Sequence, residues 1–323
     1  MIYVLLILSL VFLVVGANWL VDGSAAIARR YHISEYLIGA TIVGMGTSTP
    51  ELVVSVISAI ERHSDIAIGN VVGSNIFNVF LILGITALMM PIRYTRENLH
   101  RDIPTNIGAS VVVIILCILN IALHSEYGLG RFDGILMLIL FALYLWSTLQ
   151  NDHKQPFSQK ITNEEATITT DCYRNTAVCI IVIVFGLAGL IFGGNIFVDT
   201  ASAIAREWGV SEAIIGLTIV AGGTSLPELV SSIIAVIKKK GQMALGNIIG
   251  SNIFNLLFIL GTASVICPLT MGDISAVDWG MMLLSSLVLM LASVTFQKRQ
   301  LDRKDALIFL LIYAAYMAWL IIG

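Results

Sequence analysis

Two glutamates stand inside long apolar stretches of the chain, and the same short pattern precedes each of them. Glu51 ends the sequence GTSTPE, and Glu228 ends the sequence GTSLPE. A carboxylate within an apolar, membrane-like segment is energetically costly, so it marks a candidate functional site. Together with hydroxyl and backbone oxygens, it offers the ligands of a hard cation such as Ca²⁺, which takes six to eight oxygens.

The residues before each glutamate predict a break in a helix. Proline cannot donate a hydrogen bond to the carbonyl one turn earlier, and the flanking glycines let the backbone leave helical geometry at little cost. Carbonyls near Gly44–Thr47 and Ala221–Thr224 should therefore be released, and at membrane depth they are tolerated only where they line a cavity or bind something. With the hydroxyls of Ser48 and Ser225, they would form an oxygen cage around a cation.

Both motifs belong to an internal repeat. The segment Gly44–Asn78 recurs as Ala221–Asn255, and the register extends without a gap over about 16–84 and 193–261. Self-similarity of this length indicates the architecture before single residues are interpreted. A proline kink with a stray glutamate would explain one such motif, but it does not explain the same motif in both copies.

A second motif, GNxxGSNxxN, follows in each copy and ends at Asn78 and Asn255. Ser74 and Asn78 are four residues apart and share a helix face, as do Ser251 and Asn255, so we expect this face to add ligands to the cage. Glycines spaced for a close helix approach accompany them, namely Gly69, Gly73, Gly246 and Gly250. The remaining asparagines fit a simpler function, hydrogen bonding between helices; they are Asn70, Asn75, Asn247 and Asn252.

The helices that position these residues must cross a membrane. Of the 323 residues, 57% are hydrophobic and 12% are charged, about half the charged fraction of a soluble domain. Stretches near the twenty apolar residues that a membrane helix needs recur throughout the chain. Ten spans fit, near 2–28, 37–60, 67–90, 104–123, 131–149, 174–205, 213–237, 243–267, 277–296 and 304–322.

Five spans lie on each side of a polar connector. We expect an N-terminal five-helix repeat (1–149), a cytoplasmic connector (150–173) and a C-terminal five-helix repeat (174–323). Because five is odd, the two repeats would enter the membrane in opposite senses. The predicted fold is an all-α membrane protein whose ten transmembrane helices form two inverted five-helix repeats, a plan of secondary transporters with the site near the midplane.

The orientation follows from the lysines and arginines. If both termini lie outside, all 18 of these residues fall in inner loops except Arg62, Arg131 and Arg206. Such an excess on one side is typical of cytoplasmic loops. We therefore predict a multi-pass protein of the prokaryotic cytoplasmic membrane with both termini outside.

Several other classes of function find no support. The four cysteines show no zinc or disulfide spacing, and no HExxH, GxSxG or P-loop sequence occurs, so neither an enzyme nor a cofactor is expected. A net charge of −3 without a basic, aromatic-rich patch argues against a nucleic-acid partner. The oligomeric state is left open.

Two further pairs of polar residues match between the copies. Ser34 and Ser211 open the second span of each half, and serine is a good N-cap. Asp22 and Asp199 lie in the first helix of each half. They could meet ions on an access path, but hydrogen bonding to backbone near the helix ends is the simpler explanation.

The GTSTPE and GTSLPE motifs, each followed by GNxxGSNxxN, resemble the paired α-repeats of the cation/calcium exchanger superfamily, specifically prokaryotic sodium/calcium exchangers. The resemblance spans most of both halves. It implies ten helices in inverted repeats and electrogenic exchange of Na⁺ for Ca²⁺ by alternating access. It also implies that the first helix of each half slides across a core that holds the site.

The resemblance further implies a set of ligands. It places Ca²⁺ on Glu51 and Glu228 and on two backbone carbonyls, those of Thr47 and Thr224. It places Na⁺ on these groups and on Ser48, Ser225, Ser74, Ser251 and backbone oxygen near Gly44 and Ala221. Asn78 matches the family's asparagine, whereas Asn255 stands where well-studied exchangers often have aspartate.

Asn255 leaves the site with two formal charges instead of three. Two glutamates balance one Ca²⁺ or two Na⁺, and a third Na⁺ would leave an uncompensated charge in a low-dielectric cavity. We therefore expect coupling that approaches two Na⁺ per Ca²⁺ or that uses protons.

Two alternative functions follow from the same residues. A proton-driven divalent-cation antiporter would exchange protons on Glu51 and Glu228 and would carry Ca²⁺ without Na⁺. A passive cation channel is less favoured, because conduction requires an open multi-ion passage rather than a closed carboxylate cage.

Overall fold

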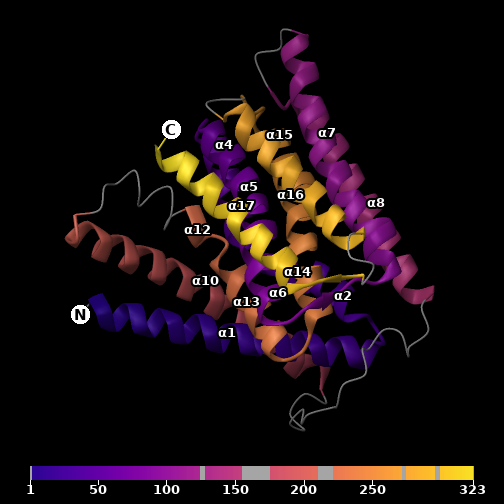
Figure 1. Cartoon of the computed structure of the whole chain (residues 1–323), viewed down its shortest axis with the longest axis vertical. Coiled ribbons are helices and arrows are strands. Elements are labelled where there is room, and N and C mark those ends of the chain that lie inside the picture. Colours follow the sequence, from indigo (N-terminus) through magenta and orange to yellow (C-terminus); the bar gives the residue numbers. More distant parts are fainter. Residues whose placement is uncertain are drawn as a thin grey trace.

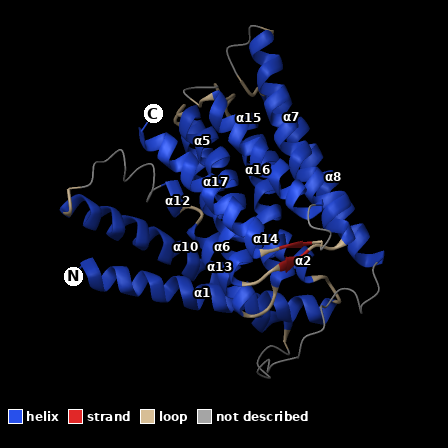
Figure 2. Ribbon diagram, in the orientation of Figure 1, coloured by secondary structure: helices blue, strands red, loops and turns tan. Residues whose placement is uncertain are grey.

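The protein is almost entirely helical (Figures 1 and 2). The structure is a computed structural model that describes residues 2–123, 128–154, 175–209, 221–270, 274–294 and 299–322. Within those ranges only two short strands occur, β1 (Ile92–Arg93) and β2 (Gln300–Leu301). Most of the predicted connector and the first part of the predicted span 213–237 lie outside the described residues.

The described helices follow the predicted spans in order. The first half contains α1 (Ile2–Tyr31), α2 (Glu35–Ile38), η1 (Gly39–Val43), α3 (Gly44–Thr47), α4 (Thr49–Ile60), α5 (Ser64–Phe77), η2 (Asn78–Leu83), α6 (Gly84–Met89), η3 (Asn98–Asp102), α7 (Ile103–Ala122) and α8 (Arg131–Lys154). The second half contains α10 (Thr176–Glu207), α12 (Ala221–Gly223), α13 (Leu226–Ile237), α14 (Gly241–Ile253), η6 (Phe254–Ile259), α15 (Leu260–Ile266), α16 (Ala276–Val294) and α17 (Arg303–Ile322). The segments labelled η are π-helical turns.

Seven continuous helices among the described residues are long and apolar enough to cross a membrane. The bent pair Glu35–Thr47 and Thr49–Ile60 would make an eighth span. The described part of the predicted span 213–237 is shorter than a membrane crossing, and α17, at the predicted span 304–322, is not among the seven. A multi-pass, all-helical protein is thus confirmed, whereas the count of ten stays a prediction.

The first helices of the two halves form a pair along one edge of the molecule. α1 and α10 lie side by side there (Figure 1). A Cβ atom on Gly16 would lie 2.7 Å from the Gly186 carbonyl oxygen, and one on Gly186 would lie 2.7 Å from the Leu20 nitrogen. Only glycine allows backbones to approach this closely. Together with residues of α2, η1, α13 and the start of α14, the pair forms an apolar core that is separate from the core of the remaining bundle.

Two backbone bridges join the halves of that bundle. β1 pairs antiparallel with β2, with Ile92 opposite Leu301. A second, isolated antiparallel bridge joins Leu129 to Leu269. Leu269 occupies the position in the second copy that Ile92 occupies in the first. Each bridge therefore connects the end of the third span of one half to a later loop of the other half.

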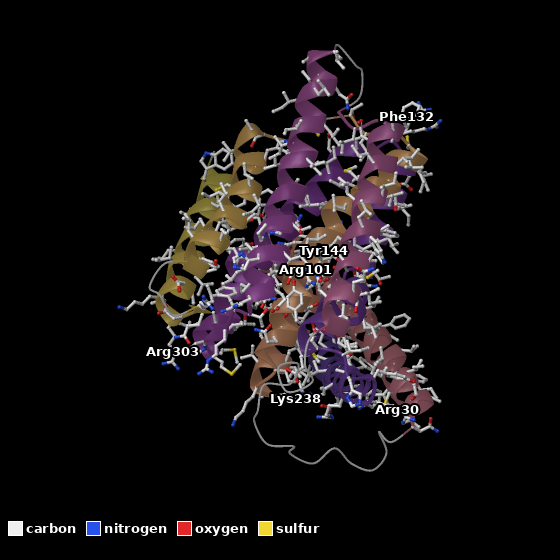
Figure 3. The ribbon with its side chains drawn as sticks, turned by 90° about the vertical axis from the view of Figure 1, so that its right-hand side faces the viewer. Arg30, Arg101, Phe132, Tyr144, Lys238 and Arg303 are labelled. Atoms are coloured by element: carbon white, nitrogen blue, oxygen red, sulfur yellow. The ribbon has the colours of Figure 1, made fainter. Side chains whose placement is uncertain are left out.

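Basic side chains gather at one end of the molecule. Arg30, Lys238 and Arg303 lie toward the same end in Figure 3, and Phe132 lies near the opposite end. These residues come from α1, the end of α13 and the start of α17, so the end is defined by both halves of the chain.

The glycines of α14 allow a close helix contact, as predicted. Added Cβ atoms on Gly246 and Gly250 would collide with the backbone carbonyls of Tyr36 and Ala40, on α2 and η1. In the first copy, the positions that would face Gly69 and Gly73 are 213 and 217, which lie outside the described residues. That part of the prediction is therefore untested.

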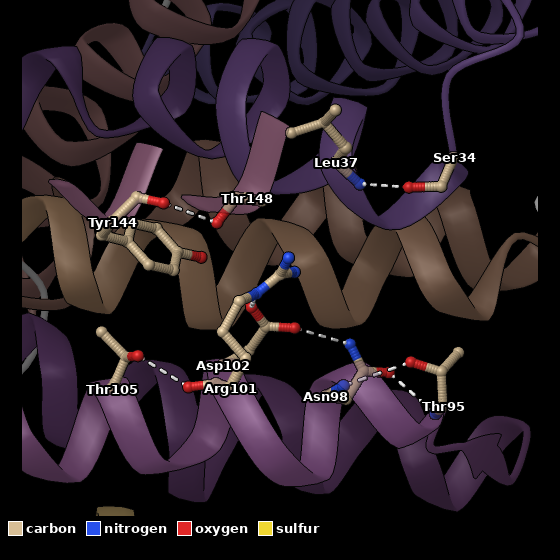
Figure 4. Close-up of polar contacts among 9 residues, drawn as sticks. All are labelled: Ser34, Leu37, Thr95, Asn98, Arg101, Asp102, Thr105, Tyr144 and Thr148. Atoms are coloured by element: carbon tan, nitrogen blue, oxygen red, sulfur yellow. Dashed lines mark hydrogen bonds and ion pairs between the residues drawn. The ribbon is translucent and has the colours of Figure 1, made fainter. Parts of the chain in front are cut away.

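An ion pair with a buried carboxylate lies where η3 meets α7 (Figure 4). The Asp102 side chain is fully buried and accepts hydrogen bonds from Arg101 Nε at 2.7 Å and Asn98 Nδ2 at 3.1 Å. The carboxylate is thus paired, which is what makes its burial tolerable.

The predicted helix-end residues had different outcomes. Ser34 caps α2, because its Oγ accepts a hydrogen bond from Leu37 N at 3.1 Å (Figure 4); its counterpart Ser211 lies outside the described residues. Backbone bonding was the wrong prediction for Asp22, whose carboxylate pairs with Lys238 Nζ at 2.7 Å instead. The lysine side chain reaches it because α1 packs along α13.

Candidate functional site

Both predicted helix breaks are present. α3 ends at Thr47 and α4 begins at Thr49, and the two segments meet at an angle of 46°. In the second half, α12 ends at Gly223 and α13 begins at Leu226. Each glutamate therefore lies in the first turn after a break, with proline just before it.

The two glutamates are held reciprocally by serines of the opposite half. Ser48 Oγ donates to Glu228 Oε1 at 2.8 Å, and Ser225 Oγ donates to Glu51 Oε1 at 3.0 Å. The exposed fractions of Glu51 and Glu228 are 1% and 0%. Ser225 Oγ also lies 3.2 Å from Ser74 Oγ, which brings the third span of the first half to the same place.

Four buried oxygen atoms of this site accept no hydrogen bond. They are Glu51 Oε2, Glu228 Oε2, Asn78 Oδ1 and Asn255 Oδ1. An unsatisfied buried acceptor costs about 1–3 kcal/mol, and more when it is charged. Both halves contribute oxygens that lack a hydrogen-bond donor. Oxygens of this kind are the ligands that a hard cation prefers.

The two site asparagines are oriented by other asparagines. Asn78 Nδ2 donates to Asn252 Oδ1 at 3.0 Å, and Asn255 Nδ2 lies 3.5 Å from Asn75 Oδ1. Since the amide nitrogens are engaged across the halves, the carbonyl oxygens remain available. Asn75 and Asn252 thus form the bonds between helices that the sequence predicted for them.

The hydroxyls of Thr47 and Thr224 are engaged elsewhere. Thr47 Oγ1 donates to Asn247 Oδ1 at 3.2 Å, and Thr224 Oγ1 donates to Asn70 Oδ1 at 3.3 Å. Each threonine side chain thus bonds to the third span of the opposite half.

The Gly44 carbonyl is not released in this conformation, contrary to expectation. It accepts hydrogen bonds from Ser48 N at 3.0 Å and from Ser251 Oγ at 3.1 Å, and Thr47 Oγ1 lies 3.3 Å from it. The break begins one turn after Gly44, so the helix bond to Ser48 survives. Ser251 of the second half thus lies against α3, the helix that precedes the first-half break; its function as a ligand stays a prediction. The structure describes the backbone of Ala221, which begins α12, but not its side chain.

The π-helical turns were not predicted. η2 begins at Asn78, and η6 spans Phe254–Ile259 and so contains Asn255. Such turns are frequent at functional sites, where they redirect side chains. Neither proline nor glycine lies within these two segments, so no breaker residue marks them in the sequence.

Carboxylates supply only part of this oxygen set. Among the described residues, no group of three or more His, Cys, Asp or Glu side chains is placed to hold a metal ion. A cation here would be bound by two carboxylates and by neutral oxygens. Such a mixed set of ligands suits Ca²⁺ and Na⁺ better than it suits zinc.

Comparisons with known proteins cover nearly the whole chain. The sodium/calcium exchanger protein family matches residues 1–150 and 178–322. This chain belongs to the sodium/calcium exchanger family. The exchanger is accordingly a transporter and not an enzyme, as the sequence predicted.

Individual relatives match this chain over most of their own length. The exchanger is 32% identical to the sodium/calcium exchanger MaX1 of Methanosarcina acetivorans, over 98% of this chain and 97% of that protein. It is 34% identical to the inner membrane protein YrbG of Escherichia coli, over 88% and 86% of the two chains. A solved structure of the sodium–calcium exchanger NCX_Mj, soaked with Na⁺ and Ca²⁺, is 31% identical with a TM-score of 0.78, over 97% and 96% of the chains.

Proposed function

We propose that this exchanger is an antiporter that uses inward Na⁺ movement to expel Ca²⁺ across the prokaryotic cytoplasmic membrane. The observation that carries the proposal is the set of four unsatisfied oxygens around Glu51 and Glu228. They come from both halves of the chain and lie beside two helix breaks. The names of MaX1 and NCX_Mj support Na⁺ and Ca²⁺ as the transported ions, and no resident cofactor is invoked.

Coupling follows from competition for one cage. Two carboxylates neutralise one Ca²⁺ or two Na⁺, so either load makes the buried site electrically neutral. An unoccupied cage would keep two buried carboxylates uncompensated, at a cost of several kcal/mol. The switch between inward and outward access is therefore favoured only when ions are bound, which links the two fluxes.

An architecture of ten helices in two inverted repeats is part of the proposal. The reciprocal serine–glutamate bonds and the two backbone bridges at matching positions support a twofold relation between the halves. The shared end of Arg30, Lys238 and Arg303 supports a cytoplasmic face there (Figure 3). That both termini lie outside is likewise part of the proposal.

The ligand set proposed for Ca²⁺ consists of Glu51, Glu228 and the carbonyls of Thr47 and Thr224. For Na⁺ the set also includes backbone oxygen near Gly44 and Ala221 and the side-chain oxygens of Ser48, Ser225, Ser74, Ser251, Asn78 and Asn255. Since Ser48 N, Ser251 Oγ and Thr47 Oγ1 all lie within hydrogen-bond distance of Gly44 O, that oxygen would join the set only after the two hydroxyls turn away from it.

The test is ⁴⁵Ca²⁺ uptake into Na⁺-loaded proteoliposomes, comparing wild type with Glu51→Gln and Glu228→Gln. Each substitution removes one of two charges, so exchange should fall at least a hundredfold. Glu61→Gln is the matched control, because Glu61 is exposed at the end of the same helix as Glu51. Full exchange in both site variants would refute the proposal, and Ca²⁺ uptake driven by a pH gradient without Na⁺ would favour the proton-driven alternative.

A further inference from the structure

Both polar atoms of the Asn247 side chain are hydrogen bonded, and together they connect the two halves of the chain. Its Nδ2 lies 3.3 Å from the Glu228 carbonyl oxygen, 3.0 Å from Ser231 Oγ and 2.8 Å from Ser232 Oγ. Its Oδ1 accepts the hydroxyl proton of Thr47, in the opposite half, at 3.2 Å. The residue is 1% exposed, so water does not compete for these bonds.

Asn70 repeats the arrangement in the first half. Its Nδ2 donates to the Glu51 carbonyl oxygen at 3.2 Å and to Ser55 Oγ at 3.0 Å. Its Oδ1 accepts from Thr224 Oγ1 at 3.3 Å. The same four-residue pattern therefore occurs twice, once around each glutamate.

The orientation of both amides is determined by chemistry. A backbone carbonyl can only accept a hydrogen bond, so the atom facing Glu228 O or Glu51 O must be the NH₂ group. The amide oxygen then faces the threonine, which must donate its proton. Turning either amide over would place its oxygen against that backbone carbonyl, so that two acceptors would face each other.

Each asparagine closes a ring of contacts. From the Glu228 backbone, the first ring passes through Asn247 to Thr47, along the chain to Ser48, and back to the Glu228 carboxylate. We call this the Glu228 ring. The Glu51 ring consists in the same way of Glu51, Asn70, Thr224 and Ser225. Both ends of a glutamate are thus fixed relative to each other by the break of the other half.

We propose that Asn70 and Asn247 are positioning residues that set the spacing of the cage oxygens without binding the ion. A cage held open by its own hydrogen bonds needs less reorganisation on binding, which raises ion affinity. The ions named here rest on the proposed function. The Glu228 ring connects buried residues, and the Glu51 ring includes the half-buried Asn70 and Thr224; both sets of contacts exist whatever the ion is.

The test is a double-mutant cycle on Thr47→Val and Asn247→Ala, measured as KM for Ca²⁺ and maximal rate of exchange in Na⁺-loaded proteoliposomes. Thr47→Val keeps the shape of the side chain and removes the hydroxyl, so KM should rise roughly tenfold while the maximal rate changes less than threefold. Thr47→Ser keeps the hydroxyl and should restore the wild-type KM. The double variant should be no worse than Asn247→Ala alone, since the threonine acts through the asparagine.

Thr49→Val is the control, because the Thr49 hydroxyl bonds within its own half of the chain, across the break to Gly46 O of α3 at 2.8 Å. Thr224→Val tests the Glu51 ring independently and gives a second reading if Asn247→Ala does not fold. An unchanged KM in Thr47→Val and Thr224→Val, or additive effects in the cycle, would overturn the proposal. If wild-type vesicles show no Na⁺-dependent Ca²⁺ uptake, the proposed function fails instead. In that case the increase in Tm that Ca²⁺ causes in the same variants tests the two rings without a transport assay. An equal increase in wild type and in Thr47→Val would contradict the proposal.

Discussion

Individual side chains show which parts of the site a sequence can predict. Glu51 and Glu228 could be identified because a carboxylate in an apolar span is costly and because the motif recurs. The links of Asn70 and Asn247 to the opposite half could not. An asparagine can bond to any neighbouring helix, and its partner depends on how the halves face each other, which spacing along the chain does not encode.

Asn255 is the residue at which charge can be changed with little change in shape. Its Oδ1 is buried and accepts no hydrogen bond. In Asn255→Asp, a third carboxylate would balance a third Na⁺, so we expect steeper Na⁺ dependence and a reversal potential closer to three Na⁺ per Ca²⁺. The measurement is ⁴⁵Ca²⁺ flux in proteoliposomes at clamped voltage. A wild-type reversal potential that already fits three-to-one exchange would show that two charges suffice.

Ser48 gives a second test of the cage. Its hydroxyl donates to Glu228 Oε1 at 2.8 Å. Ser48→Ala leaves that oxygen without its donor and should weaken Ca²⁺ binding by about 1–2 kcal/mol, roughly five- to thirtyfold in KM. Ser225→Ala should have a similar effect, because the bond is reciprocal. A change in KM for one serine variant only would indicate that the two halves bind the ion unequally.

Helix breaks and π-helical turns differ in how visible they are to a reader of the sequence. The breaks at Ser48 and at Thr224–Ser225 follow from glycine and proline, whose backbone effects are local. The π-helical turns η2 and η6 contain neither residue. They depend on packing in the whole bundle, so local sequence does not reveal them.

Contact between α14 and the η1 turn depends on glycine. A Cβ on Gly250 would collide with the Ala40 backbone, where no flexible side chain can yield. Gly250→Ala should therefore lower the free energy of unfolding by about 1–3 kcal/mol, seen as a lower Tm in detergent. Gly108→Ala is the control in α7, where no described atom lies within 4 Å of the added methyl group. A Tm equal to wild type in Gly250→Ala would mean that the helices can separate freely.

At the level of the whole molecule, the two halves are alike around Glu51 and Glu228 and differ at their ends. The α1–α10 pair has its own apolar core, apart from the bridged bundle. An ion pair joins Asp22 of α1 to Lys238 at the end of α13. The corresponding positions in the other half are Asp199 and Glu61, both exposed and both acidic. The internal repeat predicted that both halves contribute to one site. It did not predict this difference between the halves, because the Asp22–Lys238 pair depends on how α1 packs against α13.

Lys238→Gln should make the basic end of the exchanger easier to open. The pair is partly exposed, 24% for Lys238 and 38% for Asp22, so it contributes only about 0.2–1 kcal/mol. We expect up to a fivefold change in the ratio of KM values for Ca²⁺ on the two membrane faces, measured in oriented vesicles. Lys304→Gln, an exposed lysine at α17, should leave the ratio unchanged. Equal ratios in wild type and Lys238→Gln would show that the pair has no influence on the switch.

The Asp22–Lys238 ion pair on one face, and the two acidic residues Asp199 and Glu61 on the other, should favour one conformation of the ion-free transporter. With its gradients removed, the molecule would spend more time shut toward the basic end than toward the far end. Such a bias would give ions arriving from the far end a more populated conformation to bind than ions arriving from the basic end. Moving the lysine across the repeat, as Glu61→Lys with Lys238→Glu, should reverse that preference while leaving the cage itself unchanged.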